Sequence, residues 1–258
     1  MYATERLSKI RKILREKKRI DVPSLSDMLG VSEVTVRRDL VKLEEEGYLV
    51  KTFGGAVLQE TLELPRVELK SEDPFQAEKE IIGKFAAQLV VEDRDVIFLG
   101  HGSTCMEIAR NIKTRQRVTV ITNDVAIGHE IMQLNNSRLI STGGELLIGT
   151  TAMVGEMTLN SLKNIHVNRA FVTVDGIHLQ QGYTVNNFET VSLLKELGNI
   201  SKELIIVADK AKFGRVGLVN LGPLTMIPKV ISNLQIPEEY KQYYFENNIQ
   251  IYTAYDLD

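Results

Sequence analysis

The strongest constraint on the fold is a series of short apolar runs after residue 75, separated by segments with helical periodicity. Each run is continuously apolar rather than alternating, which is typical of strands that are buried on both faces of a parallel sheet. Strands that alternate with helices predict an α/β domain with a mainly parallel sheet. The runs are DVIFLG (95–100), VTVIT (118–122), RLIST (138–142), RAFVTV (169–174) and ELIIVA (203–208).

The first 58 residues follow a different pattern, with apolar side chains at helical spacing in short segments. Asp21 is placed to cap a second helix, Gly30 to end it, and Ser32 to cap a third. Two helices joined across the turn GVS have the spacing of a helix-turn-helix, whose second helix enters the major groove of DNA. The period then changes to two in YLVKTFGGAV (48–57), which predicts a hairpin, or wing.

Charge is distributed unevenly along the chain, although the net charge is only −3. Residues 1–58 carry 12 Lys and Arg against 9 Asp and Glu, whereas the remainder carries 19 against 25. A mildly basic head on an acidic body is compatible with nucleic-acid binding that is confined to the head.

The third helix of the head carries the candidate DNA contacts. With Val36, Leu40 and Leu43 facing the core, its hydroxyls and cations lie on the outer face. We expect Arg38 to read the groove, Arg37 to bind phosphate or Asp39, and Asp39 to contact an arginine or a neighbouring helix. One alternative is that the three-helix unit does not bind DNA. A separate alternative, for the wing alone, is a plain connecting hairpin. The predicted DNA-binding residues are Ser32, Thr35, Arg37, Arg38, Lys42 and, in the wing, Lys51.

A segment with two prolines, alternating charge and no sustained period separates the head from the body. We therefore predict a winged helix-turn-helix domain over residues 1–58, a linker over 59–75, and an α/β domain over 76–258 that binds an effector and oligomerises. A helix is expected over residues 76–91, ahead of the first strand.

Ligands of open α/β sheets bind at the carboxyl ends of the strands, and polar or glycine-rich segments follow the predicted strands here. They offer an anion-binding loop, an amide, close-approach glycines, a carboxylate and the lysines Lys210 and Lys212, which together suit a small polyhydroxylated phosphate. Taken singly, each is equally compatible with a turn or a solvated side chain. These candidates are Gly102, Ser103, Thr104, Asn123, Gly143, Gly144, Asp175 and Lys212.

Several classes of function find no support in the sequence. The single cysteine, Cys105, cannot form an internal disulfide, and no Cys/His cluster has zinc-like spacing. We expect no metal, no cofactor and, without a long apolar stretch, a cytoplasmic protein rather than a membrane protein. The histidines lack a partner arrangement that would favour catalysis: His101, His129, His166 and His178.

The segment VSEVTVRRDLVKLEEEGYLVKTFGGAV resembles the N-terminal signature of the DeoR family of bacterial repressors. The pieces GHGST, TND, GGELL, AFVTVDGI, GYTVNNFE and ADKAKFG resemble the family's effector domain, which is similar to ribose-phosphate isomerase. The resemblance implies a repressor of a sugar or polyol catabolic operon, with double-stranded operator DNA, a phosphorylated sugar-type effector and a homo-oligomer, dimer or tetramer, as partners. It adds Glu189 and Lys195 to the effector-binding candidates.

Two other functions stay open from the sequence. The body is alternatively a sugar-phosphate isomerase, but proton transfer needs a positioned acid/base pair. The segment DGIH keeps Asp175 and has His178 where the isomerase pattern has a second acidic residue. We therefore expect a regulator and not an enzyme. A regulator whose body only oligomerises is the third interpretation.

Overall fold

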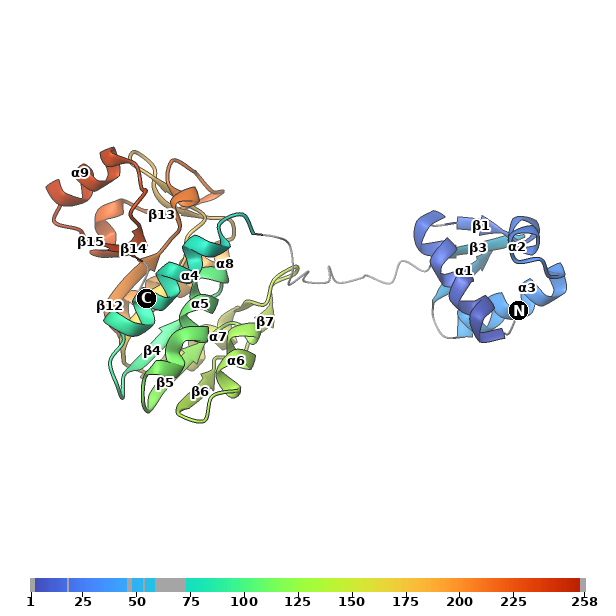
Figure 1. Cartoon of the computed structure of the whole chain (residues 1–258), viewed down its shortest axis with the longest axis horizontal. Helices are drawn as coiled ribbons and strands as arrows, with labels where there is room; N and C mark the ends of the chain where they lie inside the picture. The colour runs from blue at the N-terminus through green and yellow to red at the C-terminus, as the bar shows by residue number, and fades with distance from the viewer. Residues whose placement is uncertain (1–2, 18, 46–47, 53, 59–72, 256–258) are drawn as a thin grey trace. The chain divides into compact units, whose positions relative to one another are not determined.

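The computed structural model describes residues 3–17, 19–45, 48–52, 54–58 and 73–255. The chain divides into two compact units, Met1–Arg66 and Val67–Asp258 (Figure 1). This division falls inside the predicted linker, most of which, residues 59–72, lies outside the described residues. Each unit has its own buried apolar cluster.

The N-terminal unit, or head, is a winged helix-turn-helix. The predicted hairpin is β2 (Leu49–Thr52) paired with β3 (Gly55–Leu58), and β1 (Arg19–Asp21) adds to β3 as an antiparallel strand. The sequence did not predict β1, because three residues are too short for a visible alternation. The helices described in this unit are α1 (Ala3–Lys17), α2 (Val22–Leu29) and α3 (Glu33–Glu45).

Local signals place α2 and α3 as the sequence predicts. The Asp21 carboxylate accepts the Ser24 N–H at 2.8 Å and so caps α2. Gly30 ends α2 in the left-handed conformation with φ of 63°, and the chain then turns into α3. The core of the head is formed by α1, α2, α3 and the sheet, with these fully buried side chains among its members: Ile10, Leu14, Leu25, Val36 and Leu43.

The C-terminal unit, or body, is built on a seven-stranded sheet in which every neighbouring pair is parallel. The predicted runs form β4, β5, β6, β9 and β12, and β14 and β15 extend the sheet beyond them. In spatial order the strands are β15 (Gln250–Ala254), β14 (Lys229–Asn233), β12 (Ser201–Val207), β9 (Val167–Val172), β4 (Val96–Leu99), β5 (Val118–Thr122) and β6 (Ser137–Ser141).

Both faces of this sheet are covered. Ile97 and Leu99 of β4 join one apolar cluster, whereas Phe98 between them joins the other, as alternation along a strand requires. On the first face lie α4 (Gln76–Phe85) with its π-helical continuation (Ala86–Val90), α5 (Ser103–Asn111) and α6 (Val125–Met132). On the second face lie α7 (Glu156–Leu162), α8 (Phe188–Ile200) and α9 (Glu238–Glu246).

Shorter strands lie at the carboxyl edge of the main sheet. A hairpin is formed by β7 (Glu145–Leu146) and β8 (Met153–Val154). A second, antiparallel sheet contains β10 (Gly176–His178), β11 (Gly182–Val185) and β13 (Val219–Gly222). The chain runs outward from β4 through β5 to β6 and returns to β9 on the opposite side of β4. The connections from β4 to β5 and from β9 to β12 therefore run in opposite directions along the sheet, and this change of direction is where open α/β sheets bind ligands.

Candidate functional site

The outer face of α3 presents the predicted DNA-binding side chains of the head. Ser32 lies just before the helix, where its Oγ is 3.0 Å from Thr35 Oγ1 and its carbonyl accepts the Thr35 N–H at 2.9 Å. Arg37, Arg38 and Lys42 are exposed. Hydroxyls at the helix start followed by cations along one face provide the donors that DNA phosphates and base edges accept.

The cations of this surface differ in their partners. Arg37 Nη2 lies 3.4 Å from Glu33 Oε2, and Lys51 Nζ lies 3.0 Å from Glu44 Oε2. Arg38 and Lys42 have no ion pair or hydrogen bond from their side chains to any residue within the described ranges. The sequence offered two partners for Arg37, phosphate or Asp39. The second is wrong, because Arg37 pairs with Glu33 and Asp39 is bound by Arg6.

Asp39 binds Arg6, which ties α3 to α1. Arg6 Nε donates to one carboxylate oxygen at 2.5 Å and Nη2 donates to the other at 3.1 Å. Asp39 is 2% exposed, and a buried carboxylate loses its hydrogen bonds to water. The bidentate pair with Arg6 compensates for that loss. The expectation that Asp39 contacts an arginine or a neighbouring helix is confirmed, because its partner Arg6 lies on α1, and α3 is thereby held against α1.

A cavity of about 400 Å³ opens in the body at the carboxyl ends of β4, β5 and β9. Gly102 shapes its wall at the loop after β4. A Cβ at this position, where φ is 128°, would lie 2.9 Å from Thr173 Oγ1, which donates to the His101 carbonyl at 3.0 Å. The loop therefore closes tightly on the segment after β9, and Ser103 and Thr104 begin α5 directly at the cavity.

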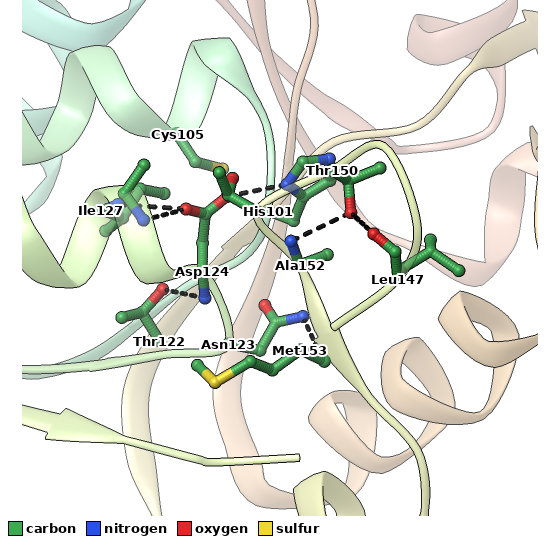
Figure 2. A network of polar contacts seen from close by, with 12 residues as sticks. His101, Cys105, Thr122, Asn123, Asp124, Ile127, Leu147, Thr150, Ala152 and Met153 are labelled. Carbon is green, nitrogen blue, oxygen red and sulfur yellow. Dashed lines mark hydrogen bonds and ion pairs between the residues drawn. The ribbon is translucent and has the colours of Figure 1, made fainter. Parts of the chain in front are cut away.

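Asp124 anchors a polar network beside the cavity (Figure 2). Its carboxylate caps α6 by accepting the Ala126 N–H at 2.8 Å and also accepts Thr151 Oγ1 at 2.8 Å. His101 Nδ1 lies 2.7 Å from the same carboxylate. Burial alone would raise the pKa of Asp124, but the hydrogen bonds, led by that of His101, hold it below its usual value. His101 thus has an orienting partner, contrary to the sequence-based expectation.

Acceptors in the cavity wall complement its donors. Asn123 is 2% exposed and donates Nδ2 to the Met153 carbonyl at 3.0 Å, while its Oδ1 has no hydrogen-bond partner within the described residues. Asp175 accepts the Asn186 N–H at 2.8 Å through one oxygen. Lys79 and Lys212 also line the cavity. The wall therefore offers cations and hydroxyls for an anion, and an amide oxygen and a carboxylate for hydroxyl groups.

Comparison with known proteins identifies both units. A model of the DeoR-like helix-turn-helix domain matches residues 6–61, and a model of the DeoR C-terminal sensor domain matches residues 75–233. The chain belongs to the DeoR family. Its members that resemble this chain are named transcriptional regulators, so this DeoR-family chain is a DNA-binding regulator and not an enzyme.

A putative aga operon transcriptional repressor from Escherichia coli O157:H7 is 31% identical, covering 92% of this chain and 88% of that protein. The glycerol-3-phosphate regulon repressor of Escherichia coli K12 is 24% identical, covering 97% and 99%. Among solved structures, ribose 5-phosphate isomerase from Plasmodium falciparum has a TM-score of 0.40 and 19% identity, covering 54% of this chain and 53% of its own.

The structure brings six of the ten predicted effector residues of this DeoR-family chain to the cavity and leaves four away from it. Gly143 instead accepts a hydrogen bond from Thr158 Oγ1 at 2.8 Å, and Gly144 packs against the same side chain. Glu189 and Lys195 are exposed on α8, whose cavity face carries Thr190, Leu193 and Leu194. The residues that line the cavity are Gly102, Ser103, Thr104, Asn123, Asp175 and Lys212.

Sequence reasoning missed several lining residues. Lys79 lies on α4, far in sequence from any predicted strand end, and no local pattern marks it. His101 stands inside the GHGST piece, and Asn186 and Asn187 stand inside the GYTVNNFE piece, so these omissions had a local signal. Among the described residues, no group of three or more potential ligands could hold a metal ion, and no helix is long and apolar enough to cross a membrane.

Proposed function

We propose that this DeoR-family regulator represses a sugar or polyol catabolic operon and that a phosphorylated sugar-type metabolite bound in the cavity releases it from its operator. The observation that carries the proposal is the composition of the cavity wall. Lys79, Lys212 and the start of α5 provide positive charge and donors, while Asn123 Oδ1 and Asp175 provide acceptors for hydroxyl groups. The name of the glycerol-3-phosphate regulon repressor supports an effector of this chemical class.

Operator binding requires more than one head. A single winged helix contacts a short half-site, so useful specificity needs two or more heads on repeated half-sites. We propose that the body forms the homo-oligomer, a dimer or tetramer, that brings the heads together. Effector binding with a coupling free energy of about 1–3 kcal/mol then changes operator affinity by roughly 5–150-fold.

The test uses full-length protein and a panel of phosphorylated sugars and polyols, each with its unphosphorylated counterpart as the control. We expect one phosphorylated compound to raise the melting temperature of the protein. The same compound should release the protein from promoter DNA, taken from the genes next to the regulator's own gene. The substitution Lys212→Met should abolish both effects without weakening effector-free DNA binding, whereas Lys113→Met, at an exposed position away from the cavity, should change neither. Uniform silence across the panel would favour a body that only oligomerises.

A further inference from the structure

Lys79 is a buried lysine in the wall of the cavity. It lies on α4, is 8% exposed, and its ammonium group forms an ion pair with Asp73. Asp209 Oδ2 lies 3.8 Å from the same ammonium. A buried cation needs anionic or strongly accepting partners, because desolvation without them is costly. Any anion that enters this part of the cavity therefore meets a lysine that already holds a carboxylate.

The two carboxylates around Lys79 are held differently. The Asp209 side chain is 2% exposed and accepts the Ala211 N–H at 2.8 Å, so it is fixed inside the fold. The Asp73 side chain is 26% exposed and lies just before α4, where it accepts the Phe75 N–H at 3.0 Å. Asp73 is therefore the partner that can leave Lys79 for water at the lower cost.

A second cation acts on Asp73. Burial alone would raise the pKa of Asp73, but the Lys79 ammonium, the Phe75 N–H and the positive charge of Lys212 together hold that pKa below its usual value. Lys212 lines the same cavity as Lys79. The neighbouring Lys210 is engaged elsewhere, with Glu78 at 3.0 Å. Asp73 is thus paired directly with Lys79 and is also stabilised electrostatically by Lys212.

We infer that Lys79 and Lys212 form the binding site for the phosphate group of the effector, and that Asp73 is an internal anion which this phosphate displaces. The inference rests on the proposed function and adds to it which group of the effector is bound there and what its binding releases. A phosphate carries more negative charge than a carboxylate and has more acceptor oxygens, so it can satisfy both lysines at once.

The exchange has a consequence at the start of the body. Asp73 also accepts the Gln76 N–H through its carbonyl at 3.0 Å, so it organises the first turn before α4. It lies just before α4, the first helix of the body. Displacement of the Asp73 carboxylate therefore loosens this turn, and occupancy of the cavity reaches the part of the body that is next to the head in the chain.

The experiment uses the full-length protein with inorganic phosphate as the probe, against chloride at equal ionic strength. Asp73→Asn removes the competing charge while keeping the shape of the side chain. It should tighten phosphate binding about fivefold, the factor for an ion pair worth about 1 kcal/mol. Glu246→Gln, an exposed acid on α9, is the matched control and should bind like the parent protein. Lys79→Met should lose phosphate binding.

Hydrogen exchange provides the second measurement. Phosphate should speed exchange of the Phe75 and Gln76 amides in the parent protein and leave it unchanged in Asp73→Asn. The inference is overturned if Asp73→Asn binds phosphate no more tightly than the parent protein, or if phosphate leaves these two amides unaffected. Failure of the proposed function looks different: Asp73→Asn tightens phosphate binding, yet no phosphorylated sugar releases DNA.

Discussion

Replacing Arg38 by alanine tests the reading of DNA by α3. Arg38 is exposed and has no side-chain partner in the described part of the chain, so its guanidinium breaks no ion pair when it meets DNA. An arginine that bonds a base edge contributes about 1–3 kcal/mol. The expected loss for Arg38→Ala is therefore about 5–150-fold in Kd on the operator, with relaxed sequence preference.

Arg37 is the matched control on the same helix. To contact DNA, Arg37 first has to break its ion pair with Glu33. This pair is exposed, has the spacing i,i+4, and is worth about 0.3–0.5 kcal/mol. If Arg37 contacts phosphate, Arg37→Ala should weaken binding to all sequences alike and lower the slope of log Kd against log salt by about one. Glu33→Ala should strengthen binding slightly, because it frees Arg37.

The assay is fluorescence anisotropy on a promoter duplex from beside the regulator's gene and on a scrambled duplex, at several salt concentrations. Thermal unfolding serves as the folding control, since truncation of an exposed side chain should leave the melting temperature unchanged. Equal losses on the two duplexes would assign Arg38 to phosphate rather than base contact. Unchanged affinity on both duplexes would remove Arg38 from the interface altogether.

Three further predictions concern the body. Gly102→Ala, with φ of 128° and a Cβ 2.9 Å from Thr173 Oγ1, should abolish the effector's thermal shift while operator affinity persists; an unchanged shift would contradict the tight loop. Because the folded-state pKa of Asp124 is lowered, its stabilisation is present above the unfolded value of about 3.9 and is lost as pH falls through the folded value. In Asp124→Asn, the free energy of unfolding measured with urea should therefore depend less on pH in this acidic range. An unaltered pH dependence would refute a stabilising role for the ionised Asp124 carboxylate. Burial raises the pKa of Cys105, so iodoacetamide should label it only after unfolding, and rapid labelling of the folded protein would oppose this.

The sequence predicts the head well because its signals are local. The cap at Asp21, the turn at Gly30 and the apolar stripe of α3 each depend on residues a few positions apart. The pairing of Arg37 with Glu33 was missed although it is also local, since Asp39 offered a competing carboxylate. Only the fold shows that Asp39 is taken by Arg6, which lies 33 residues away.

The cavity was predicted in part. Residues that directly follow β4, β5 and β9 reach it, because parallel strands bring their carboxyl ends to one edge. Gly143 and Gly144 follow β6, further along the sheet from the point where the chain reverses, and there they pack against α7 instead. Lys79 and the His101–Asp124 pair depend on how separate segments meet, which no spacing in the sequence specifies.

The head and the cavity are completed at different moments of synthesis. The head needs only the chain up to β3 at Leu58, whereas the cavity wall extends to Lys212. At about 5–20 residues per second, the ribosome takes roughly eight to thirty seconds to make the stretch between them. A nascent chain can thus fold its head long before it can bind a metabolite. Because the body that would pair two heads is also unfinished, such a chain has only the weak affinity of a single half-site contact.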